Sequence, residues 1–291
     1  MPDTGLTPQA VQTVCDWFDA NGRDLPWRRP GTSAWGVLVS EVMSQQTPMS
    51  RVIGPWHEWM TRWPTPDDLA EEESGVAVAA WGRLGYPRRA LRLHACAVAI
   101  ATEHDGTVPS TYEELITLPG IGDYTAAAIV SFAFGKRATV LDTNVRRVLA
   151  RAQSGIANCP TSVTKAERLV AEALVPDDDT RAAKWAVSSM ELGALVCTAR
   201  SPRCEVCPIH DVCRWVADGK PENAPVRRGQ PWKGTDRQCR GVIMDLVRNS
   251  PHGVRVEVAL SAWPESEQAS RCLESLIYDG LVHRCGELVT L

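Results

Sequence analysis

A glycine turn between two helices constrains the fold of this chain more than any other stretch. The sequence LPGIG at 118–122 cannot continue a helix, because proline lacks an amide donor and closely spaced glycines favour positive φ. Helical spacing and capping residues predict one helix over 110–118 and a second over 123–134. The amides of Gly120 and Gly122 therefore lie beside a helix N-terminus. They form either a plain tight turn or an anion site that suits a phosphate.

An aspartate follows this pair of helices and directly precedes a third. Asp142 is followed by the residues TNV, and apolar residues recur at helical spacing over 143–152. The pattern predicts that Asp142 is the N-cap of this helix, where its carboxylate accepts backbone N–H bonds. We expect such a carboxylate to ionise readily, which suits a group that stabilises positive charge on a substrate.

Four of the ten cysteines lie within a short segment, as Cys197-x6-Cys204-x2-Cys207-x5-Cys213. Four thiols at this spacing are the most specific signal in the chain, and they are typical of a metal centre. Disulfides are not expected, since a cytosolic compartment keeps thiols reduced. Zinc and an iron–sulfur cluster both accept four thiolates, although a zinc ribbon usually presents two CxxC-like pairs farther apart.

Composition places the chain among ordinary globular proteins. It has 291 residues, of which 44% are hydrophobic and 23% charged, enough for about two domains. No apolar run approaches the roughly 18 residues of a membrane span, and the N-terminus lacks the pattern of a signal peptide. We therefore expect a cytosolic protein without a membrane partner.

Positive charge gathers in two places, although the net charge is −4. Residues 136–151 hold five cations against one acid, and the loop 198–203 holds Arg200 and Arg203 without an acid. A charge run is usually a solvated face. Because the first run adjoins the glycine turn and the second lies between two cysteines, we expect local contacts with phosphates.

The chain before the glycine turn is predicted to be helical. After a first helix, the residues LPWRR at 25–29 break the pattern, and a second helix follows with a core stripe of Trp35, Leu38, Val39 and Val42. Glu41 lies off this stripe, as a solvated glutamate would. A turn over 81–89 then carries Tyr86 among several arginines.

The C-terminal part is predicted to be a separate small module. Residues 219–236 are rich in proline, glycine and charge and are typical of a linker. Beyond it, the pattern predicts helices over 238–248, 254–263 and 267–278, and a hairpin over 281–291. Three helices and a wing indicate a winged-helix-like module over 237–291. Its Arg237, Arg240 and Arg255 are candidates for contacts with a phosphate backbone.

Several of these motifs resemble base-excision DNA glycosylases of the helix-hairpin-helix superfamily. LPGIGDYTA is similar to their hairpin, and LDTNVRRVLAR to the segment that carries their catalytic aspartate. LPWR…WGVLVSEVMSQQTPMSRVI is similar to the MutY family of adenine glycosylases, in the compact form found in actinobacteria. The resemblance implies an all-α fold with a six-helix domain over 27–134, which includes the hairpin at 109–134. It also implies an iron–sulfur cluster domain made of 1–26 and 135–218.

The resemblance further implies which residues perform the reaction. Glu41 would protonate the adenine, and Asp142 would stabilise the sugar cation or add to C1′, a division of labour that paired carboxylates also have in O-glycosidases. Tyr124 would assist by hydrogen bonding beside the adenine, and Asn144 would bond to Asp142. Tyr124 stands where strand-cleaving relatives carry a Schiff-base lysine, which implies a monofunctional glycosylase.

Contacts with the cofactor and with DNA follow from the same resemblance. The cysteine spacing matches that of the MutY and endonuclease III families, which implies one [4Fe–4S] cluster. Gln46 and Tyr86 would be wedges that enter the base stack, although Pro87 replaces the second tyrosine of the family's GLGYY motif. The remaining DNA-binding residues would be Arg29, Gly120, Gly122, Arg200 and Arg203.

The expected function is removal of adenine mispaired with 8-oxoguanine or guanine in duplex DNA, by a monomer. In place of the Nudix-like tail with which larger relatives recognise 8-oxoguanine, this sequence has the winged-helix-like module, so the reading of the opposite base stays open. One alternative is an endonuclease III-like glycosylase/lyase for oxidised pyrimidines, which Tyr124 and Asn144 disfavour and Thr143 permits. The other is a non-enzymatic, redox-sensing iron–sulfur regulator, in which Glu41 and Asp142 would be idle.

Overall fold

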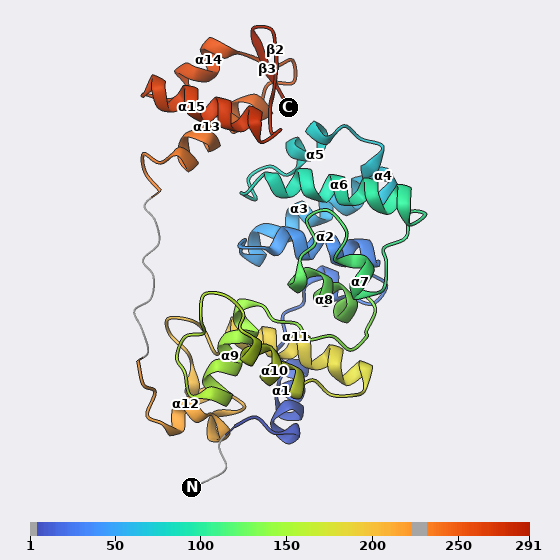
Figure 1. The fold of residues 1–291 in the computed structure, drawn as a ribbon, viewed down its shortest axis with the longest axis vertical. Helices are drawn as coiled ribbons and strands as arrows, with labels where there is room; N and C mark the ends of the chain where they lie inside the picture. Colours follow the sequence, from blue (N-terminus) through green and yellow to red (C-terminus); the bar gives the residue numbers. More distant parts are fainter. Residues whose placement is uncertain (1–4, 223–231) are drawn as a thin grey trace. The chain divides into compact units, whose positions relative to one another are not determined.

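The computed structural model describes residues 5–222 and 232–291, so the middle of the predicted linker lies outside the described residues. The described chain is mostly helical, which confirms the predicted all-α class (Figure 1). Its helices are α1 Pro8–Asn21, η1 Pro26–Arg28, α2 Ala34–Ser44, α3 Met49–Arg62, α4 Pro66–Ala70, α5 Ser74–Ala80, α6 Arg88–Glu103, α7 Tyr112–Leu115, α8 Asp123–Phe132, α9 Thr143–Ser154, α10 Lys165–Ala173, α11 Asp179–Leu195, η2 Cys204–Val206, η3 His210–Val212, α12 Arg214–Ala217, α13 Asp236–Arg248, α14 Val256–Ser261 and α15 Ser266–Tyr278. The strands are β1 Val254–Arg255, β2 His283–Cys285 and β3 Leu288–Thr290.

The helices group into two compact units, each of which is described by itself. The first unit comprises the described residues within 1–41, 110–117 and 121–226. In its core, α9 packs against α11 and α12, and α1 packs against α11 (Figure 1). Val14, Val148 and Leu192 are fully or almost fully buried there, beside the cysteine-bearing segment. A smaller core, which includes Ala128 and Ala186, forms under α8.

The second unit comprises the described residues within 42–109, 118–120 and 227–291. Three tryptophans form its centre, with Trp59 edge-on to Trp63 at 4.8 Å and to Trp81 at 5.6 Å between ring centroids. All three are buried. Aromatic pairs in this geometry add stability beyond the area that they bury, so they fix α3 against the turn that follows α5.

The C-terminal module lies in the second unit and has the predicted helices and wing. Strands β2 and β3 form the antiparallel wing, with Arg284 opposite Val289. The helix predicted over 254–263 is wrong at its start, because Val254 and Arg255 form β1 and pair with β3 in a sheet of order β1-β3-β2. Two residues of strand carry no local signal, since their pairing partner lies more than 30 residues farther along the chain.

The helix predicted over 110–118 is shorter than expected. α7 covers only Tyr112–Leu115, and Thr111 rather than an earlier residue is its N-cap. The glycine turn has the predicted positive φ at Gly120, which is +79°, but not at Gly122, which is extended with φ −108° and is the N-cap of α8. A Cβ at Gly120 would lie 2.7 Å from the Cβ of Arg92, so glycine is required there by space as well as by conformation.

None of the described helices combines the length and the apolar character needed to cross a membrane.

Candidate active site and cluster site

A buried glutamate and a tyrosine form the centre of the candidate site in the first unit. The hydroxyl of Tyr124, at the start of α8, donates to Oε2 of Glu41 over 2.7 Å. Glu41 is only 7% exposed, although it was predicted to lie off the core stripe of α2. Its pKa is raised from 4.5 to about 7, mainly by burial and further by the charge of Asp142. The Tyr124 hydrogen bond and the charge of Arg28 lower the pKa but do not offset these two effects. Glu41 is therefore able to hold a proton near neutral pH.

Asp142 is the N-cap of α9, as predicted. Its Oδ1 accepts the backbone N–H groups of Asn144 over 2.9 Å and Val145 over 2.6 Å, and its Oδ2 accepts from the Asn144 amide over 2.6 Å. These bonds lower the pKa of Asp142, as expected for an N-cap, but they do not decide the net shift. Burial outweighs these donated bonds and the nearby charge of Arg147, so the pKa of Asp142 is raised from 3.8.

Arg147 connects Asn144 to the segment that carries the cysteines. Its Nη2 donates to Oδ1 of Asn144 over 2.8 Å and to the Gly193 carbonyl over 2.6 Å, and its Nε donates to the Cys197 carbonyl over 2.6 Å. Gly193 on α11 has no room for a side chain, because a Cβ there would lie 2.7 Å from both Cβ and O of Asn144. The first turn of α9 is thus fixed from two sides, and with it the carboxylate of Asp142.

A second buried carboxylate pairs with two arginines near the site. Glu191 on α11 is completely buried and accepts from Arg23 Nε over 2.6 Å and from Arg28 Nη2 over 2.9 Å. These bonds outweigh the effect of burial and lower the pKa of Glu191 to about 2. Sequence reasoning missed all three residues, because an acid within a helix and a break containing arginines have no distinguishing local pattern.

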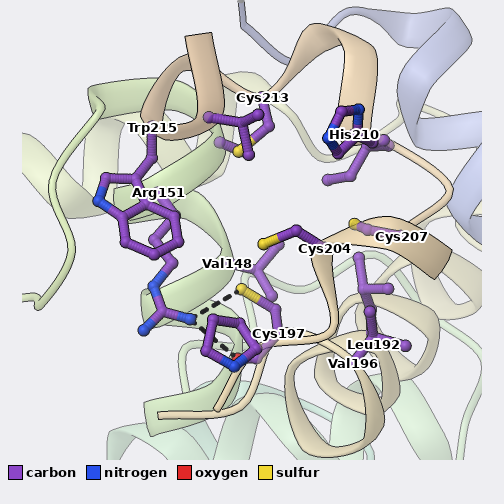
Figure 2. Close-up of a pocket in the computed structure, with 14 residues that line it drawn as sticks. Val148, Arg151, Leu192, Val196, Cys197, Cys204, Cys207, His210, Cys213 and Trp215 are labelled. Atoms are coloured by element: carbon purple, nitrogen blue, oxygen red, sulfur yellow. Dashed lines mark hydrogen bonds between the residues drawn. The ribbon is translucent and has the colours of Figure 1, made fainter. Parts of the chain in front are cut away.

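The four cysteines of the predicted metal centre surround one cavity, with sulfur atoms directed toward it from several sides (Figure 2). The cavity has about 370 Å³ of empty space, part of which is open to solvent. Apolar residues complete its wall, among them Val148, Leu192 and Ile209. Four thiolates are a donor set that suits a multi-atom iron–sulfur cluster, and the same donors also suit Zn²⁺.

Arg151 covers one side of this cavity. Its Nη1 donates to Sγ of Cys197 over 3.3 Å, and its guanidinium lies 4.7 Å from the Trp215 ring centroid (Figure 2). The same Nη1 also donates to the Thr198 carbonyl over 2.8 Å. Burial raises the pKa of the Cys207 thiol to about 12. Thiolates at such a site therefore need compensating positive charge, which iron would supply together with Arg151.

The basic run over 136–151 is mostly not available to phosphates, contrary to expectation. Arg146 is buried and bonds to Glu167 over 2.9 Å. Arg147 and Arg151 point inward, as described above, whereas Lys136 and Arg137 are exposed. The linear sequence does not distinguish solvent-exposed arginines from buried arginines that hydrogen-bond to loops inside the fold.

The predicted DNA-binding residues are distributed over both units. In the second unit Gln46 and Tyr86 are exposed, and both have positive φ. In the first unit Arg29 is exposed and pairs with Asp24 over 2.7 Å. In the same unit, Gly122 has open space around its Cα and Arg200 is exposed. Arg203 donates to the Leu195 carbonyl over 2.6 Å. Gly120, the last predicted contact, lies in the second unit.

Two of the three C-terminal arginines that were expected to contact DNA have partners within the module. Arg240 pairs with Asp279 over 2.6 Å, and Arg255 lies 3.4 Å from Glu287 and 3.8 Å from Glu257. Arg237 lies over the ring of Trp232, at 6.0 Å from its centroid. Arg240 and Arg255 would have to leave these acidic partners to contact phosphates, which argues against the expected DNA contacts of both residues.

Comparisons with known proteins identify two matching families. Residues 39–174 match the HhH-GPD superfamily of base excision DNA repair proteins, and residues 197–213 match the iron–sulfur binding domain of endonuclease III. The second match begins and ends at the first and last of the four cysteines. The cofactor of this chain is accordingly one [4Fe–4S] cluster, for which Cys197, Cys204, Cys207 and Cys213 are the candidate ligands.

Relatives similar over nearly the whole chain include two mycobacterial adenine DNA glycosylases. The protein from Mycolicibacterium smegmatis is 50% identical over 94% of this chain and 92% of its own length, and the one from Mycobacterium tuberculosis is 48% identical over 98% and 94%. The human adenine DNA glycosylase is 41% identical over 69% of this chain and 38% of its own length.

Solved structures show the same fold. A thermostable thymine-DNA glycosylase, 27% identical, has a TM-score of 0.64 over 72% of this chain and 95% of its own. A non-covalent endonuclease III–DNA complex, 24% identical, has a TM-score of 0.60 over 74% and 98%, which concerns the fold alone. By its relatives this chain is a DNA N-glycosylase of base excision repair, and it belongs to the adenine DNA glycosylase family of the helix-hairpin-helix superfamily.

Proposed function

We propose that this enzyme removes adenine mispaired with 8-oxoguanine or guanine from duplex DNA, without cleaving the strand. One observation carries the proposal: Glu41, a buried carboxyl whose pKa is about 7, lies in the same unit as Asp142 and is affected by its charge. An N-glycosidic bond breaks through a cationic sugar, so the reaction needs an acid at the base and an anion at the sugar. Two carboxyl groups with separate environments supply both.

Glu41 is proposed as the proton donor to N7 of adenine. Tyr124 donates to Oε2 of Glu41, which leaves Oε1 to carry the proton and orients it. A general acid works best when its pKa lies near the operating pH, and burial sets the pKa of Glu41 in that range. Protonation of the base weakens the bond between N9 and C1′ and makes adenine a neutral leaving group.

Asp142 is proposed as the anion that stabilises the sugar cation, or that adds to C1′ before water replaces it. Its carboxylate is fixed by α9 and by Asn144, so little reorganisation is needed as positive charge develops. The [4Fe–4S] cluster would be held by the four cysteines and would give the surrounding loop a rigid frame. The reaction itself requires only the chain's own side chains and water.

The absence of a suitable amine supports a monofunctional reaction. The chain has lysines only at 136, 165, 184, 220 and 233, and α8 contains none. Tyr124 is a poor nucleophile in addition, because burial and the neighbouring charge of Glu41 raise its pKa well above 10. A Schiff base with the sugar is therefore not expected.

Mispair selectivity is proposed to begin with unstacking. A mispaired adenine is extruded at lower cost than a paired one, and Gln46 and Tyr86 are proposed as the wedges that use this difference. Gly120, Gly122, Arg29, Arg200 and Arg203 are proposed to contact the backbone. The C-terminal module is proposed to contribute to the preference for 8-oxoguanine over guanine. A monomer acting on chromosomal DNA in the cytoplasm completes the proposal.

The test is base release from four duplexes that carry A:8-oxoG, A:G, A:C and A:T, with alkali to reveal each abasic site. We expect release from the first two, little from A:T, and no strand cleavage without alkali. Borohydride trapping separates the alternative: a covalent complex with an oxidised-pyrimidine duplex would show a glycosylase/lyase and refute the proposal. DNA binding without base release from any duplex would favour the regulator.

A further inference from the structure

Two exposed side chains in the second unit have an unusual backbone. Gln46 has φ +54° and Tyr86 has φ +50°, a left-handed conformation in which Cβ crowds the following carbonyl. Such a conformation persists only where surrounding contacts hold it. The two residues lie in different turns, one after α2 and one before α6, so something must hold both turns.

The guanidinium of Arg89 contacts both turns. Its Nη1 donates to the carbonyl of Gln45 and to that of Val42 over 2.9 Å, and its Nη2 donates to the carbonyl of Gly85 over 3.1 Å. Gln45 and Gly85 are the residues that directly precede Gln46 and Tyr86. One planar group therefore fixes the peptide on the N-terminal side of each strained residue.

Neighbouring side chains strengthen this connection. Thr47 accepts from Nη2 of Arg89 over 3.0 Å, and its hydroxyl is 3.3 Å from the Leu84 carbonyl in the second turn. Trp81 donates from Nε1 to the Gly85 carbonyl over 2.9 Å. The Arg89 guanidinium lies 5.2 Å from the Trp81 ring centroid and 5.4 Å from that of Tyr86, so it also orients the Tyr86 side chain.

Burying the charged side chain of Arg89 here costs free energy of folding. It is 7% exposed, its partners within the described chain are carbonyl and hydroxyl oxygens rather than carboxylates, and its Nε has no partner there. Burial lowers the pKa of Arg89 to about 10. A buried cation without an anion is usually destabilising, which is easier to explain if the position of the two turns matters for function.

We propose that Arg89 is a positioning residue that sets Gln46 and Tyr86 together for insertion into DNA. The inference rests on the proposed function of these two side chains as wedges. Lysine cannot replace Arg89, because a single ammonium group lacks the planar fork that reaches both turns at once. The prediction is that loss of the fork impairs extrusion of the adenine and leaves the chemistry at Glu41 and Asp142 intact.

The experiment compares Arg89→Lys with Arg62→Lys. Arg62 is a matched control, since it also lies over a tryptophan, Trp63 at 4.5 Å, and bonds to Glu72, but it contacts neither turn. Single-turnover release is measured from an A:G duplex and from the same strand with its adenine unpaired in a one-base bulge. Unstacking is followed by the fluorescence of 2-aminopurine beside the adenine.

For Arg89→Lys we expect release from the A:G duplex to slow by on the order of 10 to 100-fold, with a smaller fluorescence rise. Release from the bulge should change by less than about threefold, because extrusion costs least for an unpaired base. Arg62→Lys should match the wild type in every measurement. An equal loss on both substrates, or an unchanged fluorescence rise with slow release, would overturn the inference.

Thr47→Val guards against a variant that fails to fold. It removes only the hydroxyl that joins the two turns, and it should show the same pattern in weaker form, with no additional loss when combined with Arg89→Lys. Fully additive losses would refute a shared role. The proposed function is tested separately: if the wild type unstacks the duplex but releases no adenine, that proposal fails, while the fluorescence of the variants still tests the positioning by Arg89.

Discussion

Replacing Glu41 with glutamine removes a buried acid and keeps the shape of the side chain. In the folded protein the pKa of Glu41 is about 7, against 4.5 for an ordinary glutamate. The folded state therefore holds this proton more tightly than the unfolded state does. As pH rises above 4.5 the unfolded chain ionises first, which lowers the free energy of the unfolded state, so Glu41 lowers the stability of the wild type progressively until the pH exceeds 7.

The size of this effect follows from the shift. A difference of 2.5 pKa units corresponds to about 3 kcal/mol when Glu41 is fully ionised, as at pH 8, and to about 1 kcal/mol at pH 5. The stability difference between Glu41→Gln and the wild type, in favour of the variant, should therefore be about 2 kcal/mol larger at pH 8 than at pH 5. In the variant the hydrogen bond from Tyr124 goes to an uncharged side chain. Its contribution to stability is therefore nearly the same at pH 5 and at pH 8 and largely cancels from the comparison.

The same variant should lose most of its activity. Without a proton donor, adenine release should fall by about 100 to 10,000-fold, which is the usual contribution of general acid catalysis. Wild-type release should itself decline as pH rises through about 7, because the acid form of Glu41 is then lost. A variant that is both more stable and inactive would show that the enzyme maintains this acid at a cost in stability.

The assay is urea unfolding of both proteins at pH 5 and pH 8, together with single-turnover release on the A:G duplex. Glu103→Gln, at the exposed end of α6, is the matched control and should show no pH-dependent difference from the wild type. A stability difference for Glu41→Gln that is equal at both pH values would refute a raised pKa. Undiminished release would refute the proposed role as acid.

Three further outcomes are expected. Asp142→Asn should slow adenine release by at least about 100-fold with nearly unchanged duplex binding, because its charge acts on the transition state; wild-type turnover would contradict this. Arg147→Lys should slow release by on the order of 10-fold with unchanged iron content, whereas full activity would show that the bond to Asn144 is dispensable. Purified protein should be yellow-brown with about four iron and four sulfide per chain, and stoichiometric zinc without visible absorption would contradict the cluster.

Local sequence was sufficient for the features that depend on a few neighbouring residues. The Asp142 cap and the glycine turn at 118–122 were predictable because capping and backbone preferences act within one helical turn. The core stripe of α2 was predictable from spacing alone, and so was the cysteine-bearing segment. The burial of Glu41 was not, because it depends on residues far along the chain such as Tyr124, whose hydroxyl bonds to the Glu41 carboxylate.

The remaining features depend on contacts between segments far apart in the chain. Arg147 and Arg151 look like phosphate ligands in the sequence, yet they bond to carbonyls of residues near 197, about fifty residues away. Glu191 is one acid among many until Arg23 and Arg28 approach it. The upward shift of the Asp142 pKa has the same origin, since burial by the whole unit outweighs the local effect of the helix end.

Gly193 has a consequence for reading natural variation in such enzymes. By chemical similarity alanine is the mildest exchange for glycine, and position 193 lies on a helix, where alanine is normally favoured. Here the added methyl group would push directly on Asn144, which bonds to the Asp142 carboxylate. A variant that a general substitution scale grades as benign would thus disturb the candidate active site, although position 193 lies about fifty residues from Asp142 in the sequence.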